Sequence, residues 1–170
     1  MTVGELYPRL DAGDAFRLVM RLRELGLHIA FAESCTGGLC AAGVVTVPAA
    51  SSVLNASYVT YANEAKTALV GVSPETLAAH GAVSEEVAAE MAAGAAAAAE
   101  AEIGVGITGI AGPTGGSEEK PIGTVCFGFS VGGRVVTAKR HFGELGRGGV
   151  RAAAVRFVYE RLLSLLSEEK

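Results

Sequence analysis

The chain has 170 residues and a formal net charge of −4, because 14 Lys and Arg stand against 18 Asp and Glu. This length fits one domain with a sizeable core, and the weak negative charge excludes the basic footprint of a nucleic-acid-binding protein. Half of the residues are hydrophobic and 19% are charged, which is not the composition of a disordered chain. We therefore expect residues 1–170 to form a single folded domain.

The distribution of charges and cysteines indicates a cytoplasmic protein. Charged residues spread through the first 25 positions break the apolar core that a signal peptide needs. Residues 34–63 carry no charge, but the polar residues, glycines and Pro48 in this segment favour a buried α/β segment over a membrane span. The three cysteines are an odd number without CxxC spacing, so neither a disulfide framework nor a zinc site is expected.

The first part of the chain predicts helices alternating with strands. An apolar stripe predicts a helix over residues 11–26, closed by Gly26, and residues 27–32 predict a short buried strand. A turn over residues 33–38 leads into an apolar helix over residues 39–47, which Pro48 ends. A second strand over residues 56–61 precedes a helix that Asn63 caps and that reaches Val70.

The second part adds helices and then a hairpin. Ser73-Pro74 and Ser84 predict two helix starts, the second followed by an alanine-rich body over residues 87–100. Residues 103–108 predict a third strand, and residues 123–131 and 134–142 predict two strands joined by Gly132-Gly133. A final helix is expected over residues 148–166. This order predicts a three-layer α/β/α fold with a mixed, mostly parallel sheet and a C-terminal antiparallel hairpin.

A literal GxGxxG match at residues 104–109 does not predict a dinucleotide site. That fingerprint requires its glycines between a strand and a helix start, with an acid about 20 residues further on. Here the glycines fall within the third predicted strand, and no acid follows at that distance before the hairpin. We interpret the segment as a strand of small residues packed closely against its neighbours.

Two strand ends carry residues that are suited to catalysis. Ser34, Cys35 and Thr36 follow the first strand, just before a glycine pair that starts a helix, where backbone N–H groups favour negative charge. An ordinary helix cap is the alternative there. Tyr61 lies at the carboxyl end of the second strand, and Lys66 lies in the first turn of the helix after it. A lysine in an uncharged neighbourhood can serve as a base, unless it is simply exposed. The histidines fall where structural roles are expected, although a Ser-His-Asp arrangement stays open.

Several motifs resemble the CinA C-terminal-domain family. They are AESCTGG at residues 32–38, YVTYANEAK at 58–66, HGAVS at 80–84, ITGIAGP at 107–113 and GGSEEKPIGTV at 115–125. The family includes nicotinamide-nucleotide amidohydrolases, which convert nicotinamide mononucleotide to nicotinate mononucleotide and ammonia. It occurs alone or fused behind a larger domain, and this chain resembles the stand-alone form. The resemblance implies a three-layer α/β/α fold with a mixed sheet and an amidohydrolase without metal or other cofactor.

The resemblance also implies roles for individual residues. Ser34 would be the nucleophile, Lys66 its base, and Tyr61 a hydroxyl that relays protons or orients Lys66. Backbone N–H groups of residues 36–38 would hold the oxyanion, and residues 109–116 with basic side chains, including Lys120, would contact the phosphate. The expected substrate-binding residues are Cys35, Thr36, Gly37, Gly38, Thr108, Gly109, Ala111, Gly112, Gly115, Gly116, Arg147 and Arg151.

Two departures from the family pattern and two alternative functions remain. Family members often have Asp where Thr114 stands, and Gly-Asp-Arg where this chain has residues 144–147, so substrate affinity or loop order could differ. The chain could instead be a catalytically weak regulatory or interaction domain, or Cys35 could be the nucleophile, since a thiol at a helix N-terminus can have a lowered pKa. The expected partner is a small pyridine nucleotide, with neither nucleic acid nor membrane, and the expected assembly is a homo-oligomer, specifically a dimer.

Overall fold

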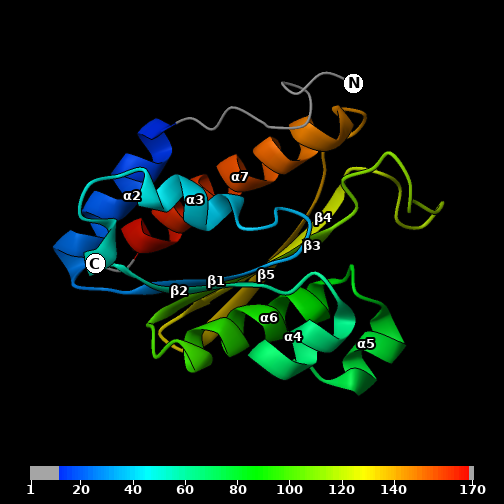
Figure 1. Cartoon of the computed structure of the whole chain (residues 1–170), viewed down its shortest axis with the longest axis horizontal. Coiled ribbons are helices and arrows are strands. Elements are labelled where there is room, and N and C mark those ends of the chain that lie inside the picture. The colour runs from blue at the N-terminus through cyan, green and yellow to red at the C-terminus, as the bar shows by residue number, and fades with distance from the viewer. Residues whose placement is uncertain (1–11, 169–170) are drawn as a thin grey trace.

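A five-stranded sheet separates two layers of helices in the computed structural model, which describes residues 12–168 (Figure 1). One face is covered by α2 (Ala12–Leu25), α3 (Leu39–Val45) and α7 (Gly146–Glu168). The other face is covered by α4 (Asn63–Val70), α5 (Pro74–His80) and α6 (Glu85–Ala98). The three-layer α/β/α fold predicted from the sequence is therefore confirmed.

The sheet has the order β2-β1-β3-β4-β5. Its strands are β1 (Ile29–Glu33), β2 (Leu54–Val59), β3 (Ile103–Gly109), β4 (Thr124–Val131) and β5 (Arg134–His141), with a short 3-10 helix, η1 (Ala50–Ser52), before β2. β1 pairs in parallel with both β2 and β3, while β4 is antiparallel to β3 and β5. Because β1, β2 and β3 run in one direction, their carboxyl ends meet at one edge of the sheet.

The helix starts predicted from serines are confirmed, and one predicted cap is wrong. The Ser73 hydroxyl accepts from two N–H groups of α5, and the Ser84 hydroxyl accepts from one N–H group of α6. Asn63 is the first residue of α4 and not its cap, because the extended residue before the helix is Ala62, which has no side-chain oxygen. β2 begins and ends two residues before its predicted bounds, so Tyr61 lies beyond the strand. The predicted first helix included Asp11, which lies outside the described residues.

The two faces of the sheet are packed differently. Phe31, Ile103, Phe127 and other large side chains fill the core under α2, α3 and α7. On the opposite face, a Cβ atom at Gly104 or Gly106 would overlap a backbone carbonyl oxygen of α6. Large residues therefore alternate with glycines along β3, as the period of a strand requires. The GxGxxG segment is the close-packed strand that the sequence predicts.

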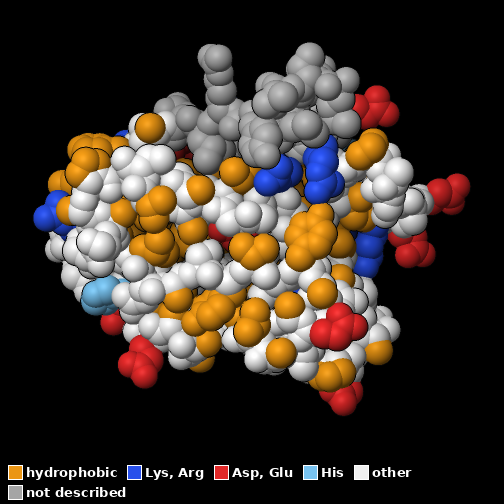
Figure 2. Space-filling model, in the orientation of Figure 1, with side chains coloured by type: hydrophobic (Ala, Val, Ile, Leu, Met, Phe, Trp, Pro, Cys, Tyr) orange, Lys and Arg blue, Asp and Glu red, His pale blue; other side chains and the backbone are white. Residues whose placement is uncertain are grey.

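No helix among residues 12–168 has both the length and the apolar character that a membrane crossing needs. On the face that Figure 2 shows, hydrophobic side chains lie in small groups and the acidic side chains lie mainly near the edge of the view. Tyr61, at 59% exposure, is among the most exposed large hydrophobic side chains of the described chain.

Candidate active site

The carboxyl ends of β1 and β2 bring the expected catalytic residues together. Ser34 follows β1 directly, Tyr61 lies two residues after β2, and Lys66 lies in α4 just beyond. The first two turns of α7 supply Arg147 and Arg151, which hydrogen-bond to these same segments. This edge is where open α/β sheets bind their ligands, so the geometry gives the predicted residues a common location.

Ser34 and Lys66 face each other in this location. The Lys66 Nζ lies 3.5 Å from Ser34 Oγ, at the outer limit of a hydrogen bond. The same ammonium donates to the backbone carbonyl of Thr60 at 2.8 Å and to that of Tyr61 at 3.3 Å. The Lys66 amine is thus held by two carbonyl oxygens and aimed at the serine hydroxyl.

The burial of Lys66 acts against its charged form. Its side chain is only 1% exposed, and it has no carboxylate partner among residues 12–168. Burial lowers the pKa of Lys66, while charge interactions with Cys35 and Glu64 act in the opposite direction and are smaller. A neutral amine at this position could accept the proton of a serine hydroxyl.

The hydroxyl of Tyr61 points to an arginine in this structure. It accepts a hydrogen bond of 2.9 Å from Arg147, whose guanidinium also donates to the carbonyl of Gly112 at 2.9 Å. The contact of Tyr61 with Lys66 is made by its backbone carbonyl. Arg147 therefore joins the segment after β2 to the glycine turn after β3.

Arg151 holds the turn that carries Ser34. Its Nε donates to the carbonyl of Cys35 at 3.1 Å, and one Nη donates to the carbonyl of Thr36 at 3.0 Å. We call residues 34–38 the Ser34 turn. Both arginines expected at the phosphate thus have backbone acceptors within the protein, and their contacts fix the turns that line the site.

Glu33 is a site residue that the sequence interpretation missed. Its side chain is fully buried at the end of β1, and the carboxylate accepts hydrogen bonds of 3.0 to 3.1 Å from the N–H groups of Gly38, Cys40 and Ala41. These are the first free donors of α3, so Glu33 stabilises both the helix start and the turn before it. The signal in the sequence was an acid four residues before a glycine pair that begins a helix.

The expected oxyanion donors need revision in part. The N–H of Gly37 donates to the Ser34 carbonyl and that of Gly38 donates to Glu33, so neither is free. Within residues 12–168, the N–H groups of Cys35 and Thr36 have no oxygen acceptor. The positive φ angles of Gly37 and Gly38 form the turn that leaves these two donors unpaired. The Thr36 hydroxyl is also buried without a described partner.

The thiol of Cys35 is poorly placed to act as a nucleophile. It is buried, and burial raises its pKa to about 12, with a further increase from the nearby charge of Glu33. The arginines at the start of α7 lower this pKa by less. The thiol stays protonated at neutral pH, which weighs against the cysteine alternative.

The turn after β3 contains both packed and exposed residues. The Thr108 hydroxyl donates to the carbonyl of Ala82 at 2.8 Å, and the Ala111 side chain belongs to the hydrophobic core. Gly109 lies against β4, where an added Cβ would come within 2.8 Å of Val125. These residues shape the turn by packing, and Gly112 contributes the carbonyl that Arg147 binds.

The following residues form the exposed part of the same turn. Thr114, Gly115 and Gly116 are exposed, and their N–H groups have no acceptor in the described part of the chain. Lys120, expected to contribute charge, donates its ammonium to the carbonyl of His80 at 2.7 Å. The exposed N–H groups are thus the open donors of this segment.

The histidines take no part in the Ser34 site. His28 hydrogen-bonds to Glu102, and His80 lies 3.5 Å from a carboxylate oxygen of Glu86. His141 ends β5, the edge strand of the sheet. In the described chain, no three His, Cys, Asp or Glu side chains are grouped as a metal ion would require.

Comparison with known families explains this arrangement. Residues 14–166 match the family described as CinA C-terminal domain. The chain belongs to the CinA C-terminal domain family. Solved structures of the family share its fold: the competence/damage inducible protein CihA from Agrobacterium tumefaciens is 40% identical with a TM-score of 0.89, over 97% of this chain and 99% of that one. A CinA superfamily protein from Escherichia coli is 37% identical with a TM-score of 0.85, over 97% and 99% of the two chains.

Members of the CinA family differ in length. The match to a CinA-like protein of Kosmotoga olearia is 48% identical over 84% of this chain but covers only 34% of that relative. A putative competence-damage inducible protein of Symbiobacterium thermophilum is 53% identical over 66% of this chain and 26% of its own length. The nicotinamide-nucleotide amidohydrolase PncC of Enterobacter agglomerans is 48% identical, over 84% of this chain and 87% of its own. The chain thus spans about a third or less of the length of the first two relatives and most of the length of PncC.

Proposed function

We propose that this CinA-family protein is an amidohydrolase that converts nicotinamide mononucleotide and water to nicotinate mononucleotide and ammonia. The observation that carries the proposal is the buried Lys66 amine, 3.5 Å from Ser34 Oγ and without a carboxylate partner in the described chain. The 48% identity to a relative named as a nicotinamide-nucleotide amidohydrolase supports the choice of substrate.

The first half of the reaction uses Ser34 and Lys66. Neutral Lys66 accepts the hydroxyl proton while Ser34 Oγ bonds to the carboxamide carbon of the substrate. The N–H groups of Cys35 and Thr36 are the free donors that could hold the resulting oxyanion, and each such donor is worth about 3 kcal/mol. Protonated Lys66 then gives its proton to the departing nitrogen, which leaves as ammonia.

The second half reverses the roles at the same atoms. Lys66, neutral again, accepts a proton from water as the water oxygen bonds to the acyl carbon. The bond to Ser34 Oγ breaks, and the proton returns to the serine, releasing nicotinate mononucleotide. One amide bond and one water molecule are consumed for each acid and ammonia formed.

The nucleotide phosphate needs donors outside the catalytic pair. The exposed N–H groups of residues 114–116 have no described acceptor and form part of a glycine-rich turn of the kind that binds anions. Arg147 and Arg151 add positive charge beside that turn and the Ser34 turn. Replacing either arginine should therefore weaken binding of the nucleotide more than binding of the phosphate-free riboside.

The deciding experiment measures ammonia released from nicotinamide mononucleotide by the purified protein. Wild type should release ammonia, and Ser34→Ala should lose several orders of magnitude in kcat while keeping its circular dichroism spectrum. Cys35→Ala is the matched control and should keep most of the activity. No release by wild type would favour the regulatory domain, and loss in Cys35→Ala with turnover kept in Ser34→Ala would make the thiol the nucleophile.

A further inference from the structure

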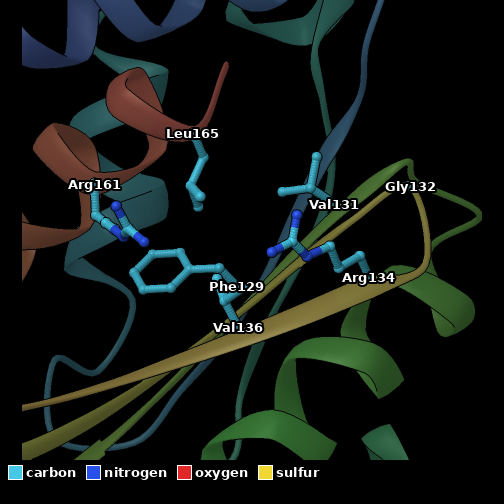
Figure 3. A pocket seen from close by; sticks show the side chains of 7 residues that line it. All are labelled: Phe129, Val131, Gly132, Arg134, Val136, Arg161 and Leu165. Carbon is cyan, nitrogen blue, oxygen red and sulfur yellow. The ribbon is translucent and has the colours of Figure 1, made fainter. Parts of the chain in front are cut away.

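A cavity lies far from the Ser34 turn. It has a volume of about 340 Å³ and opens between the β4–β5 hairpin and the C-terminal part of α7 (Figure 3). We call it the hairpin cavity, and its lining residues are Phe129, Val131, Gly132, Arg134, Val136, Arg161 and Leu165. Val131 pairs with Ile103, the first residue of β3, whereas the catalytic edge lies beyond the last residue of that strand. A strand of this length spans about 20 Å, so the two sites are separate.

The hairpin cavity has an apolar part between its polar walls. Figure 3 shows the Phe129 side chain near its centre, with Leu165 on the helix side and Val136 on the strand side. These side chains extend from the hydrophobic core of the domain. A volume of 340 Å³ is at the small end of the range of ligand pockets, about 300 to 1,000 Å³, so the cavity fits a small molecule.

Two arginines on the walls carry charge that the protein does not compensate. Figure 3 shows the guanidinium groups of Arg134 and Arg161 on either side of Phe129. Neither group has a hydrogen bond or ion pair within the described chain, although Arg161 is half-buried. A half-buried cation without a partner is costly, and guanidinium groups match carboxylates with two parallel hydrogen bonds. The charge is therefore complementary to an anion that enters from outside.

We propose that the hairpin cavity binds a small organic carboxylate with a flat apolar body. The carboxylate would accept hydrogen bonds from Arg134 and Arg161, and the apolar body would lie against Phe129 and Leu165. Aromatic rings suit this position because both the phenylalanine ring and a guanidinium plane stack on them. This site is independent of the amidohydrolase reaction and involves none of its residues.

The test compares 2-naphthoate with its neutral isostere 2-naphthamide. Binding is followed by calorimetry and by amide chemical shifts in an NMR titration of the full chain. We expect 2-naphthoate to bind with a Kd below about 1 mM and at least about tenfold more tightly than the amide, with the largest shifts around residues 129–136 and 161–165. Arg134→Gln and Arg161→Gln should each weaken binding of 2-naphthoate about tenfold and leave binding of 2-naphthamide unchanged.

Arg156→Gln is the matched control, because Arg156 is exposed on α7 outside the cavity. It should leave the affinity for 2-naphthoate unaltered, and retained binding of the amide reports that each variant is folded. The proposal is overturned if carboxylate and amide bind equally, or if no shifts occur at about 5 mM ligand. Shifts centred on the Ser34 turn, or an Arg161→Gln variant that binds like wild type, would overturn it as well.

Discussion

Glu33 gives the sharpest test of how the Ser34 turn is built. In Glu33→Gln one carboxylate oxygen becomes an NH2 group, while the size and shape of the side chain stay almost the same. One carboxylate oxygen now accepts from Gly38 and Cys40, and the other accepts from Ala41. The glutamine amide can keep its oxygen toward the N–H groups of Gly38 and Cys40. Its NH2 group then faces the N–H of Ala41, and two donors cannot form a hydrogen bond with each other.

The cost can be worked from these three bonds. A hydrogen bond to a charged group contributes about 1.5–3 kcal/mol and a neutral one about 1 kcal/mol, while a buried donor without an acceptor costs about 1–3 kcal/mol. Two weakened bonds and one lost bond lower the free energy of unfolding by about 4 kcal/mol. With a denaturant slope of about 2 kcal/mol per molar urea, the midpoint falls by about 2 M. Displacement of Ser34 by about 1 Å should also lower kcat about 100-fold.

The assay combines urea unfolding with the rate of ammonia release, and Glu90→Gln is the control. Glu90 accepts from the N–H of Ser73 at 2.7 Å and from the Thr76 hydroxyl at 2.6 Å. A glutamine there can keep both contacts, because its NH2 group can donate to the hydroxyl. We expect a loss below about 1 kcal/mol and unchanged turnover in this control. Equal midpoints and equal kcat for the two variants would refute the role of Glu33 in organising the turn.

Three further predictions concern the base, the tyrosine and the helix contact. The rate of ammonia release should rise with pH through the lowered pKa of Lys66, and a flat pH–rate profile would contradict this. Lys66→Arg should be inactive because guanidinium stays protonated. Because burial lowers the pKa of this lysine in the folded state, the unfolded state binds more protons than the folded state. The free energy of unfolding should therefore rise with pH up to the unfolded pKa of about 10.4, and urea unfolding of Lys66→Met should lack that rise. Tyr61→Phe loses only the hydroxyl that accepts from an arginine, so its kcat should fall about tenfold, and a loss as large as that of Ser34→Ala would argue for a direct chemical role. Gly106→Ala should lose about 3 kcal/mol or more in thermal unfolding, because its Cβ would overlap the carbonyl of Ala88, and an unchanged Tm would show that α6 can move away.

The proximity of Ser34 and Lys66 could be predicted because it depends on local order. A strand followed by a polar turn recurs at Ser34 and before Lys66, and parallel strands place such turns at one edge of a sheet. Helix starts at Ser73 and Ser84 were likewise encoded by neighbouring residues. Properties fixed within a few positions of the chain are therefore visible in the sequence.

The remaining features depend on contacts between distant segments. Nothing near Arg151 indicates that its guanidinium binds carbonyls 115 or 116 positions earlier, because that depends on where α7 docks. The inward direction of Glu33 was missed because a charged residue is rarely fully buried unless it finds several partners. Which N–H groups donate to Glu33, and which stay available for an oxyanion of the proposed reaction, follows only from the shape of the turn.

The arginine contacts from α7 also set an order in time. A ribosome makes the chain from its N-terminus, so Ser34, Lys66 and all five strands exist before Arg147 and Arg151 are added. Until then the carbonyls of Cys35 and Thr36 lack their guanidinium partner, and the glycine turn is not tied to Tyr61. A nascent chain, or one trimmed by a protease before α7, would lack these contacts to the Ser34 turn. Completion of the last helix is therefore needed before the two arginines can hold the turns at this edge of the sheet.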